Sequence, residues 1–166
     1  MYGAAYRGEA LDALVTQAAA SPDSTDYADR FARGATQRHG AWMRASEQRY
    51  ALRERWQAFF EDFDVLLAPI MPTAAFPHDQ GGSINKRTYE VNGMTRPYLD
   101  QLTWAGLVTV VHLPATVAPV GRTRSGLPVG LQVVGPYLGD RTTLDFAGRM
   151  ADAIGGTMER FDLFAN

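Results

Sequence analysis

Two apolar runs on either side of a short polar turn constrain the fold of this chain most. Residues 115–118 and 127–135 are rich in valine, leucine and other small apolar residues, which is typical of buried strands. Between them, residues 122–126 read Arg-Thr-Arg-Ser-Gly, and Gly126 suits a turn position with a positive φ angle. The pattern therefore predicts an antiparallel β-hairpin.

Residues 1–63 carry helical patterns. A second helix is predicted from Asp26 to about His39, with Ser24 or Thr25 as its cap and Gly40 as its end. In the third helix, apolar side chains recur at helical spacing, opposite a charged face. That apolar stripe consists of Leu52, Trp56, Phe59, Phe60 and Phe63.

Further elements follow the helical region. A short apolar run that ends at a proline predicts a buried strand at residues 64–69. Residues 68–97 are rich in proline and glycine and are predicted to form a long loop. A short helix is expected around residues 97–105, and residues 108–111 (Val-Thr-Val-Val) are strand-like. Asp140 is predicted to cap a last helix, whose expected buried face is Leu144, Ala147, Ala151 and Ile154.

These elements predict a single domain of the α/β class over residues 1–166. It comprises a helical part (1–63), a part with strands and a long loop (64–135) and a terminal helix (140–156). N-terminal helices are expected to pack with a small mixed sheet that contains the antiparallel hairpin. Such a sheet is thin for this chain length, so we expect it to continue into strands from elsewhere.

Composition excludes several functions. The net charge of −2 carries no basic excess, so no nucleic-acid partner is expected. No apolar run approaches the roughly 20 residues of a membrane span, so no membrane partner is expected either. The chain has no cysteine, which rules out disulfides and cysteine nucleophiles and is compatible with a cytoplasmic location. His39, His78 and His112 fit no metal spacing, and neither a metal nor a cofactor is expected.

Lys86 is the only lysine, so any mechanism that needs a lysine must use it or take one from another chain. Ser83 and Lys86 have the Ser-x-x-Lys spacing of a β-lactamase-type nucleophile and base. The companion motifs of that class are missing, and the segment lies between Pro77 and Gly93 in the predicted loop. We therefore interpret the pair as a solvent-exposed turn and predict no catalytic residue in this chain.

Three separated segments carry distinctive motifs. The first is residues 59–73 (Phe-Phe-Glu-Asp-Phe-Asp-Val-Leu-Leu-Ala-Pro-Ile-Met-Pro-Thr). The other two are residues 113–121 (Leu-Pro-Ala-Thr-Val-Ala-Pro-Val-Gly) and 126–136 (Gly-Leu-Pro-Val-Gly-Leu-Gln-Val-Val-Gly-Pro). By these motifs the chain resembles the amidase-signature family: the first is similar to its phenylalanine-rich helix and the strand after it, and the other two to its C-terminal hallmark. The segments occur in the family's order, and the resemblance is weakest over residues 1–40.

The hallmark residues themselves have structural interpretations, and one segment departs from the pattern. Gly130 lets another backbone approach, and the Gln132 amide is expected to hydrogen-bond a neighbouring loop. Ahead of Leu-Pro-Ala the family often has Asn-Leu-Ala-Gly, where this chain has Thr109-Val-Val-His112. Thr109 thus replaces the usual asparagine, and His112 replaces the usual glycine.

The resemblance implies the C-terminal part of an amidase-signature fold and the hydrolysis of carboxylic amides to acid and amine. In that family, a lysine activates a bridging serine, which activates a nucleophilic serine. These residues lie in and upstream of a Gly/Ser-rich stretch that is absent here. We therefore expect a C-terminal portion that is inactive alone. Its expected partners are the missing N-terminal portion, a small-molecule amide in the full-length enzyme, and a second copy in a homo-oligomer such as a dimer.

Asp100 and Trp104 are the candidate substrate-binding residues, because the family's C-terminal region closes one side of the substrate cleft. Asp100 is similar to the acidic residue that holds the substrate ammonium group in the glutamine-using transamidation subunit. Alternatively, Arg96 pairs with Asp100 and both are structural, while Trp104 is either a cleft wall or core. Two other functions stay open, namely part of a transamidation subunit or a non-catalytic structural or binding module.

Overall fold

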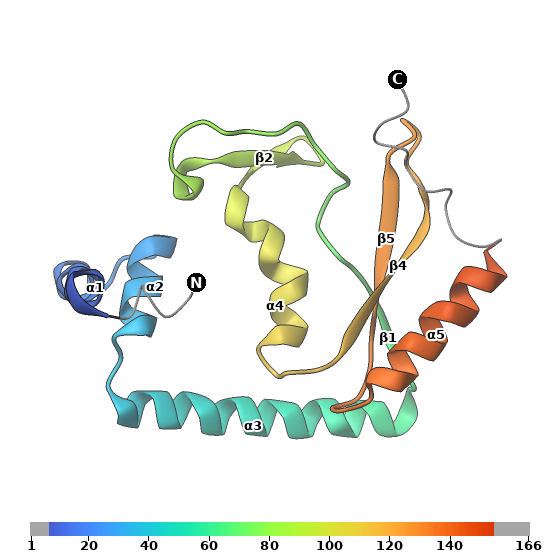
Figure 1. The fold of residues 1–166 in the computed structure, drawn as a ribbon, viewed down its shortest axis with the longest axis horizontal. Coiled ribbons are helices and arrows are strands. Elements are labelled where there is room, and N and C mark those ends of the chain that lie inside the picture. Colours follow the sequence, from blue (N-terminus) through green and yellow to red (C-terminus); the bar gives the residue numbers. More distant parts are fainter. Residues whose placement is uncertain (1–6, 155–166) are drawn as a thin grey trace. The chain divides into compact units, whose positions relative to one another are not determined.

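A computed structural model describes residues 7–154 of the chain (Figure 1). The α/β class predicted from sequence is confirmed, since helices and antiparallel strands occur together. In chain order, the elements are α1 (Gly8–Ala20), α2 (Tyr27–Ala35), α3 (His39–Asp62), β1 (Leu66–Pro69), the 3₁₀ turn η2 (Ile84–Lys86), β2 (Thr88–Val91), β3 (Met94–Pro97), the 3₁₀ turn η3 (Tyr98–Leu102), α4 (Thr103–Thr109), β4 (Ala115–Arg122), β5 (Pro128–Val134) and α5 (Asp140–Ala153).

The chain divides into two compact units. The first unit comprises Met1–Gln48 and Gln80–Leu99, and the second comprises Arg49–Asp79 and Asp100–Asn166. Helix α3 runs from one unit into the other. The single domain over residues 1–166 stays a prediction, and residues 155–156 of the predicted terminal helix lie outside the described residues. No helix in residues 7–154 is both long and apolar enough to cross a bilayer.

The second unit is built on a three-stranded sheet in the order β1-β5-β4. Both pairings are antiparallel, with Val134 opposite Leu66 on one side and Ala115 on the other. The predicted hairpin is therefore confirmed as β4 and β5, and Gly126 has the expected positive φ, at 86°. The sequence predicts a mixed sheet, but every strand pair within residues 7–154 is antiparallel.

Alternation along β5 gives the second unit a hydrophobic cluster on each face of the sheet. Neighbouring side chains of a strand point to opposite faces, and Val133 and Val134 accordingly join different clusters. Val133 packs with Ala118 and with Ala147 of α5, which lies along the hairpin in Figure 1. Val134 packs with Val108 of α4 and, from α3, with Trp56 and Phe60. Burial of each such valine stabilises the fold by about 1.5 kcal/mol or more.

The N-terminus of α5 is tied to the sheet by a short chain of hydroxyl groups. Thr116 of β4 donates to the Thr143 hydroxyl at 2.8 Å, and Thr143 donates to the Asp140 carbonyl at 2.8 Å. Asp140 is the first helical residue and Gly139 is the N-cap, so the predicted cap at Asp140 is wrong by one position. Of the predicted buried face, Ala147 is buried as expected, but Leu144 and Ile154 are 61% and 49% exposed, and Thr143 is buried instead.

Residues 108–111 have strand-like composition and instead end a helix. Val108 and Thr109 close α4. The backbone N–H of Leu113 donates to the Val108 carbonyl at 3.1 Å, and that of His112 donates to the Thr109 carbonyl at 3.2 Å. These are the two bonds of a Schellman motif. The β-branched composition favours a strand locally, but burial of Val108 and Leu113 in one cluster decides for the helix end.

The first unit holds α1, α2, the N-terminal part of α3 and the β2–β3 hairpin. The side chain of Asp26 caps α2 by accepting the Ala28 backbone N–H at 2.8 Å, so the cap lies one or two residues beyond the predicted Ser24 or Thr25. Helix α3 begins at His39 and continues through Gly40, where the sequence predicts an interruption.

The predicted long loop contains a hairpin that sequence analysis missed. Strands β2 and β3 pair antiparallel around Asn92 and Gly93, both with positive φ angles of 52° and 75°. Asn-Gly between two short strands is a strong hairpin signal, and it was present in the sequence.

Candidate functional site

The predicted site residues lie at the start of α4. Asp100 is half-buried in the 3₁₀ turn η3, and its carbonyl accepts a hydrogen bond from the Thr103 hydroxyl at 2.7 Å. Trp104 is half-buried one turn further on. The turn and the helix thus place the two residues four positions apart on consecutive turns.

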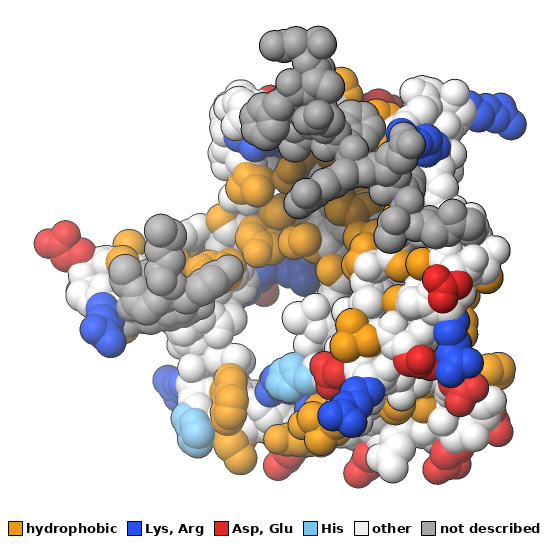
Figure 2. Space-filling view, turned by 45° about the vertical axis from the view of Figure 1, so that its right-hand side comes forward, with side chains coloured by type: hydrophobic (Ala, Val, Ile, Leu, Met, Phe, Trp, Pro, Cys, Tyr) orange, Lys and Arg blue, Asp and Glu red, His pale blue; other side chains and the backbone are white. Residues whose placement is uncertain are grey.

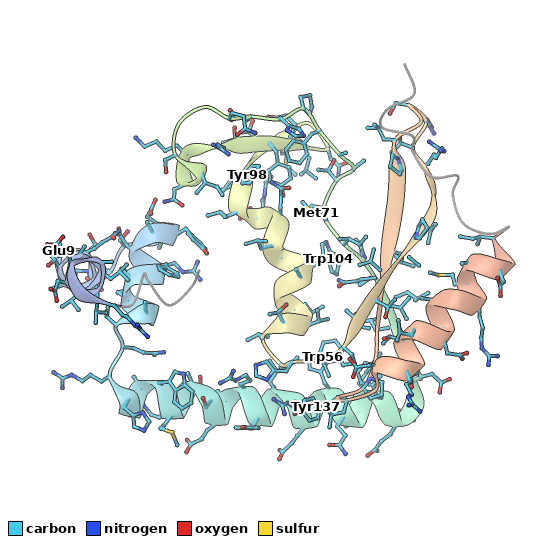
Figure 3. All side chains as sticks on the ribbon, viewed as in Figure 1. Glu9, Trp56, Met71, Tyr98, Trp104 and Tyr137 are labelled. Carbon is cyan, nitrogen blue, oxygen red and sulfur yellow. The ribbon has the colours of Figure 1, made fainter. Side chains whose placement is uncertain are left out.

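Gln132 connects this helix to the end of β1. It is 5% exposed in the middle of the sheet. Its Nε2 group donates to the Pro69 carbonyl at 2.9 Å and lies 3.4 Å from the Trp104 carbonyl. In Figure 3, Trp104 accordingly lies on the side of α4 that faces the loop carrying Met71. The sequence predicts a hydrogen bond from Gln132 to a neighbouring loop, but the acceptors are the last residue of β1 and a residue of α4.

The loop after β1 forms one wall of a cavity of about 430 Å³. The β-hairpin supplies the other wall, which includes Gly130. A Cβ atom at Gly130 would lie 2.6 Å from Ile70 Cδ1 and 3.4 Å from the Ala118 carbonyl oxygen. The closest neighbour is therefore the Ile70 side chain, with the β4 backbone farther away, whereas the sequence predicts the approach of another backbone. The lining comprises residues 69–75, Val120 and residues 128–131.

A second cavity of about 440 Å³ lies among α3, α4 and β1. Its lining is largely apolar and includes Trp56 and Phe59, two members of the apolar stripe recognised in the sequence. The other lining residues are Leu52, Arg55, Leu66, Leu107 and Val110. Asp100 and Trp104 line neither of these two cavities, so the structure brings the predicted residues together with each other but not with either hollow.

The exposed side of α5 differs from these apolar hollows. Figure 2 shows acidic and basic side chains interspersed over this helix. Asp145 and Arg149, one helical turn apart on α5, form an exposed ion pair at 2.8 Å. Mixed exposed charge is typical of a solvated helix face.

Ser83 and Lys86 form a turn in the first unit. Ser83 Oγ accepts the backbone N–H of Asn85 at 3.4 Å and is the N-cap of η2. The backbone N–H of Lys86 donates to the Ser83 carbonyl at 2.9 Å, and both side chains are exposed. The Ser83 hydroxyl is thus engaged in capping this turn.

Comparison with known proteins places the chain in a family. The family profile described as Amidase matches residues 10–144, which is most of the chain. The chain belongs to the amidase-signature family. Its match includes α4, the sheet and the start of α5, so the resemblance seen in three sequence segments extends over both units.

Curated relatives include components of an amidotransferase. The chain is 32% identical over 114 residues to the glutamyl-tRNA(Gln) amidotransferase A subunit of Wolinella succinogenes, covering 69% of this chain and 23% of the relative. It is 28% identical over 149 residues to the corresponding protein of Rhodospirillum rubrum, covering 87% and 28%. The chain therefore spans about a quarter of the length of these relatives.

Solved structures show the same fold. A crystal structure of an amidase aligns with a TM-score of 0.63 and 25% identity, covering 89% of this chain and 33% of that one. A chain from a vestigial protein complex, described as revealing the evolutionary origins of an s-triazine catabolic enzyme, also aligns with a TM-score of 0.63. Its identity is 24%, with 92% and 33% covered. This amidase-family chain thus corresponds to about one third of each solved chain.

Sequence analysis missed the cavity wall formed by residues 69–75. The signal was available, because Pro69, Pro72 and Thr73 belong to the first family-like segment. These residues lie in the predicted long loop, and a cavity depends on the facing hairpin, which supplies Val120 and residues 128–131 from a distant part of the sequence.

Proposed function

We propose that this chain builds part of the substrate-cleft wall of an enzyme that hydrolyses carboxylic amides to acid and amine. The family match over residues 10–144 carries the proposal, and alignment with one third of a solved amidase supports it. In this proposal, Asp100 and Trp104 face a small-molecule amide, and Gln132 positions the backbone beneath Trp104.

In this enzyme, residues other than these 166 would carry out the amide hydrolysis. A serine hydroxyl is a weak nucleophile until a positioned base takes its proton. The single lysine, Lys86, is exposed on a 3₁₀ turn whose serine caps a backbone N–H. We therefore expect the Ser–Ser–Lys centre to come from the remainder of an amidase fold, and this chain to be inactive alone.

An ammonia-release assay tests whether the catalytic residues lie outside this chain. The chain alone, incubated with a panel of aliphatic and aryl amides, is expected to give no turnover. Co-expression with the N-terminal two thirds of a related amidase is expected to give turnover that needs that portion's lysine. Turnover by the chain alone that disappears in Ser83→Ala would falsify the proposal.

A second candidate is a part of a glutamine-dependent transamidation subunit. The observation that favours it is that the curated relatives named above are amidotransferase A subunits. In this case, Asp100 would hold the ammonium group of glutamine. In the co-expressed complex, Asp100→Asn should then raise KM for glutamine while leaving KM for an uncharged amide unchanged. Asp145→Asn, at the ion pair on α5, is the matched control.

The chain alone is also proposed to self-associate. The lining of the second cavity includes Leu107 and Val110, which are 37% and 51% exposed in this chain. Exposed apolar surface of this kind favours association with a second copy. Sedimentation should show a concentration-dependent dimer, and a clean monomer at high concentration would contradict the expectation.

A further inference from the structure

His112 occupies a backbone position that favours glycine. It is the left-handed residue of the Schellman motif that ends α4, and its φ angle is 58°. A side chain in this left-handed conformation costs free energy relative to glycine. Because strained residues of this kind cluster at functional sites, the surroundings of the imidazole ring are informative.

The ring lies between two arginines of α3. Arg49 Nη1 is 3.1 Å from His112 Nε2, and Arg53 Nη2 is 3.3 Å from Nδ1. A guanidinium group only donates hydrogen bonds, and a neutral imidazole has a single acceptor nitrogen. One of the two contacts must therefore place a donor against a donor, and protonation of the ring would remove the remaining acceptor. The imidazole alone thus cannot accept a hydrogen bond from both guanidinium groups.

Arg53 is held in place by groups other than the histidine. Its Nε group donates to the Val111 carbonyl at 3.1 Å. Its guanidinium carbon lies 4.1 Å from the ring centroid of Tyr137 and 5.1 Å from that of Tyr50. Tyr137 precedes Leu138, another non-glycine residue with a positive φ angle, at 63°. Two strained turns therefore present their side chains to the same guanidinium group.

We infer that Arg49, Arg53 and His112 form an oxyanion-binding site for a ligand bearing a carboxylate or phosphate group. Such a ligand offers acceptor oxygens to both guanidinium groups and to a ring N–H group at once, and arginine matches both anions with paired N–H donors. The fixed position of Arg53 lowers the entropy lost on binding. The site lies wholly in the second unit, and it is independent of the proposed amide hydrolysis.

Titration of the full chain with inorganic phosphate tests the site, with sodium chloride holding the ionic strength constant. The readout is the NMR shift of the three histidine ring protons. The His112 resonance should move and saturate, while His39 and His78 serve as internal references. A parallel titration with acetate distinguishes a carboxylate site from a phosphate site. If neither anion produces a saturable shift of His112, the inference is wrong.

Variants distinguish specific anion binding at this site from nonspecific attraction of anions to positively charged side chains. Arg53→Gln should weaken binding by about tenfold or more, since it removes at least one charge-assisted hydrogen bond. Arg55→Gln removes the same charge two positions along α3 and should leave affinity unchanged. An equal loss in both variants would overturn the inference.

His112→Gly provides a variant that is not expected to compromise folding. It restores the residue that the motif favours, so the melting temperature should rise. Phosphate affinity, followed by calorimetry, should fall at the same time. Higher stability with unchanged affinity would remove His112 from the site and contradict the proposal.

Discussion

The two units bury their side chains very differently. In the first unit, α1 has no buried residue and α2 buries only Ala32 among its described residues. In the second unit, β5 alone places Gln132, Val133 and Val134 in the interior. The three family-like segments, residues 59–73, 113–121 and 126–136, all lie in the second unit. A buried strand needs particular side chains at particular positions, whereas an exposed helix needs only a suitable average composition.

The largest expected effect comes from placing a charge in each unit. Val133 is fully buried, so Val133→Asp leaves an unpaired carboxylate in the sheet and should cost roughly 4 kcal/mol or more. Val15 of α1 is 50% exposed, and Val15→Asp should change stability by less than about 0.5 kcal/mol. Urea unfolding followed by circular dichroism measures both. Similar losses of stability in the two variants would contradict the difference in burial between the two units.

The next test uses one glutamine from each unit. Gln132→Leu removes the donor to the Pro69 and Trp104 carbonyls and should cost about 2 kcal/mol. Gln17 donates to Asp29 Oδ1 at 2.9 Å near the surface, and Gln17→Leu should cost less than about 1 kcal/mol. Amide hydrogen exchange should show faster exchange in α4 for the first variant only. Unchanged α4 protection would mean that Gln132 does not hold this helix.

Glycine substitutions distinguish crowding from backbone conformation. A Cβ atom at Gly139 would lie 2.8 Å from the Pro136 carbonyl oxygen, so Gly139→Ala should cost about 2 kcal/mol. Gly93 has open space but a φ angle of 75°, and Gly93→Ala should cost about 1 kcal/mol. Gly106→Ala is the control, because it has open space within α4 and should stabilise by about 0.5 kcal/mol or more. The melting temperatures of the three variants give the order of their effects on stability.

The smallest effect is a pH dependence confined to the first unit. Hydrogen bonds, from Ser24 first and then from Gln17, hold the pKa of the Asp29 carboxyl below its usual value. A lowered folded-state pKa stabilises the fold above the unfolded value of about 3.9 and loses this contribution as pH falls through the folded value. Asp29→Asn should therefore reduce the loss of α1 and α2 amide protection as the pH falls from about 5 to about 3. An identical loss of amide protection in the variant would mean that other carboxyl groups cause the pH dependence.

Local signals accounted for much of the fold. The aromatic stripe on α3, the strand at β1, the β4–β5 turn at Gly126 and the terminal helix each depend on neighbours a few positions away. Errors arose where local and distant preferences disagree. Residues 108–111 have strand-like composition, but contacts of Val108 with Leu113 and Val134 favour a helix end. The β2–β3 hairpin was missed although Asn92 and Gly93 signalled it.

The sequence by itself determined the family, because hallmark residues such as Gly126, Gly130 and Gln132 recur in a fixed order that does not depend on coordinates. Tertiary structure alone decided which groups meet. Gln132 reaches the Pro69 carbonyl across 63 positions, and Arg53 reaches His112 across 59. Such contacts depend on strand register and on where a helix ends. Both are set by the burial of distant side chains against each other, which no local pattern records.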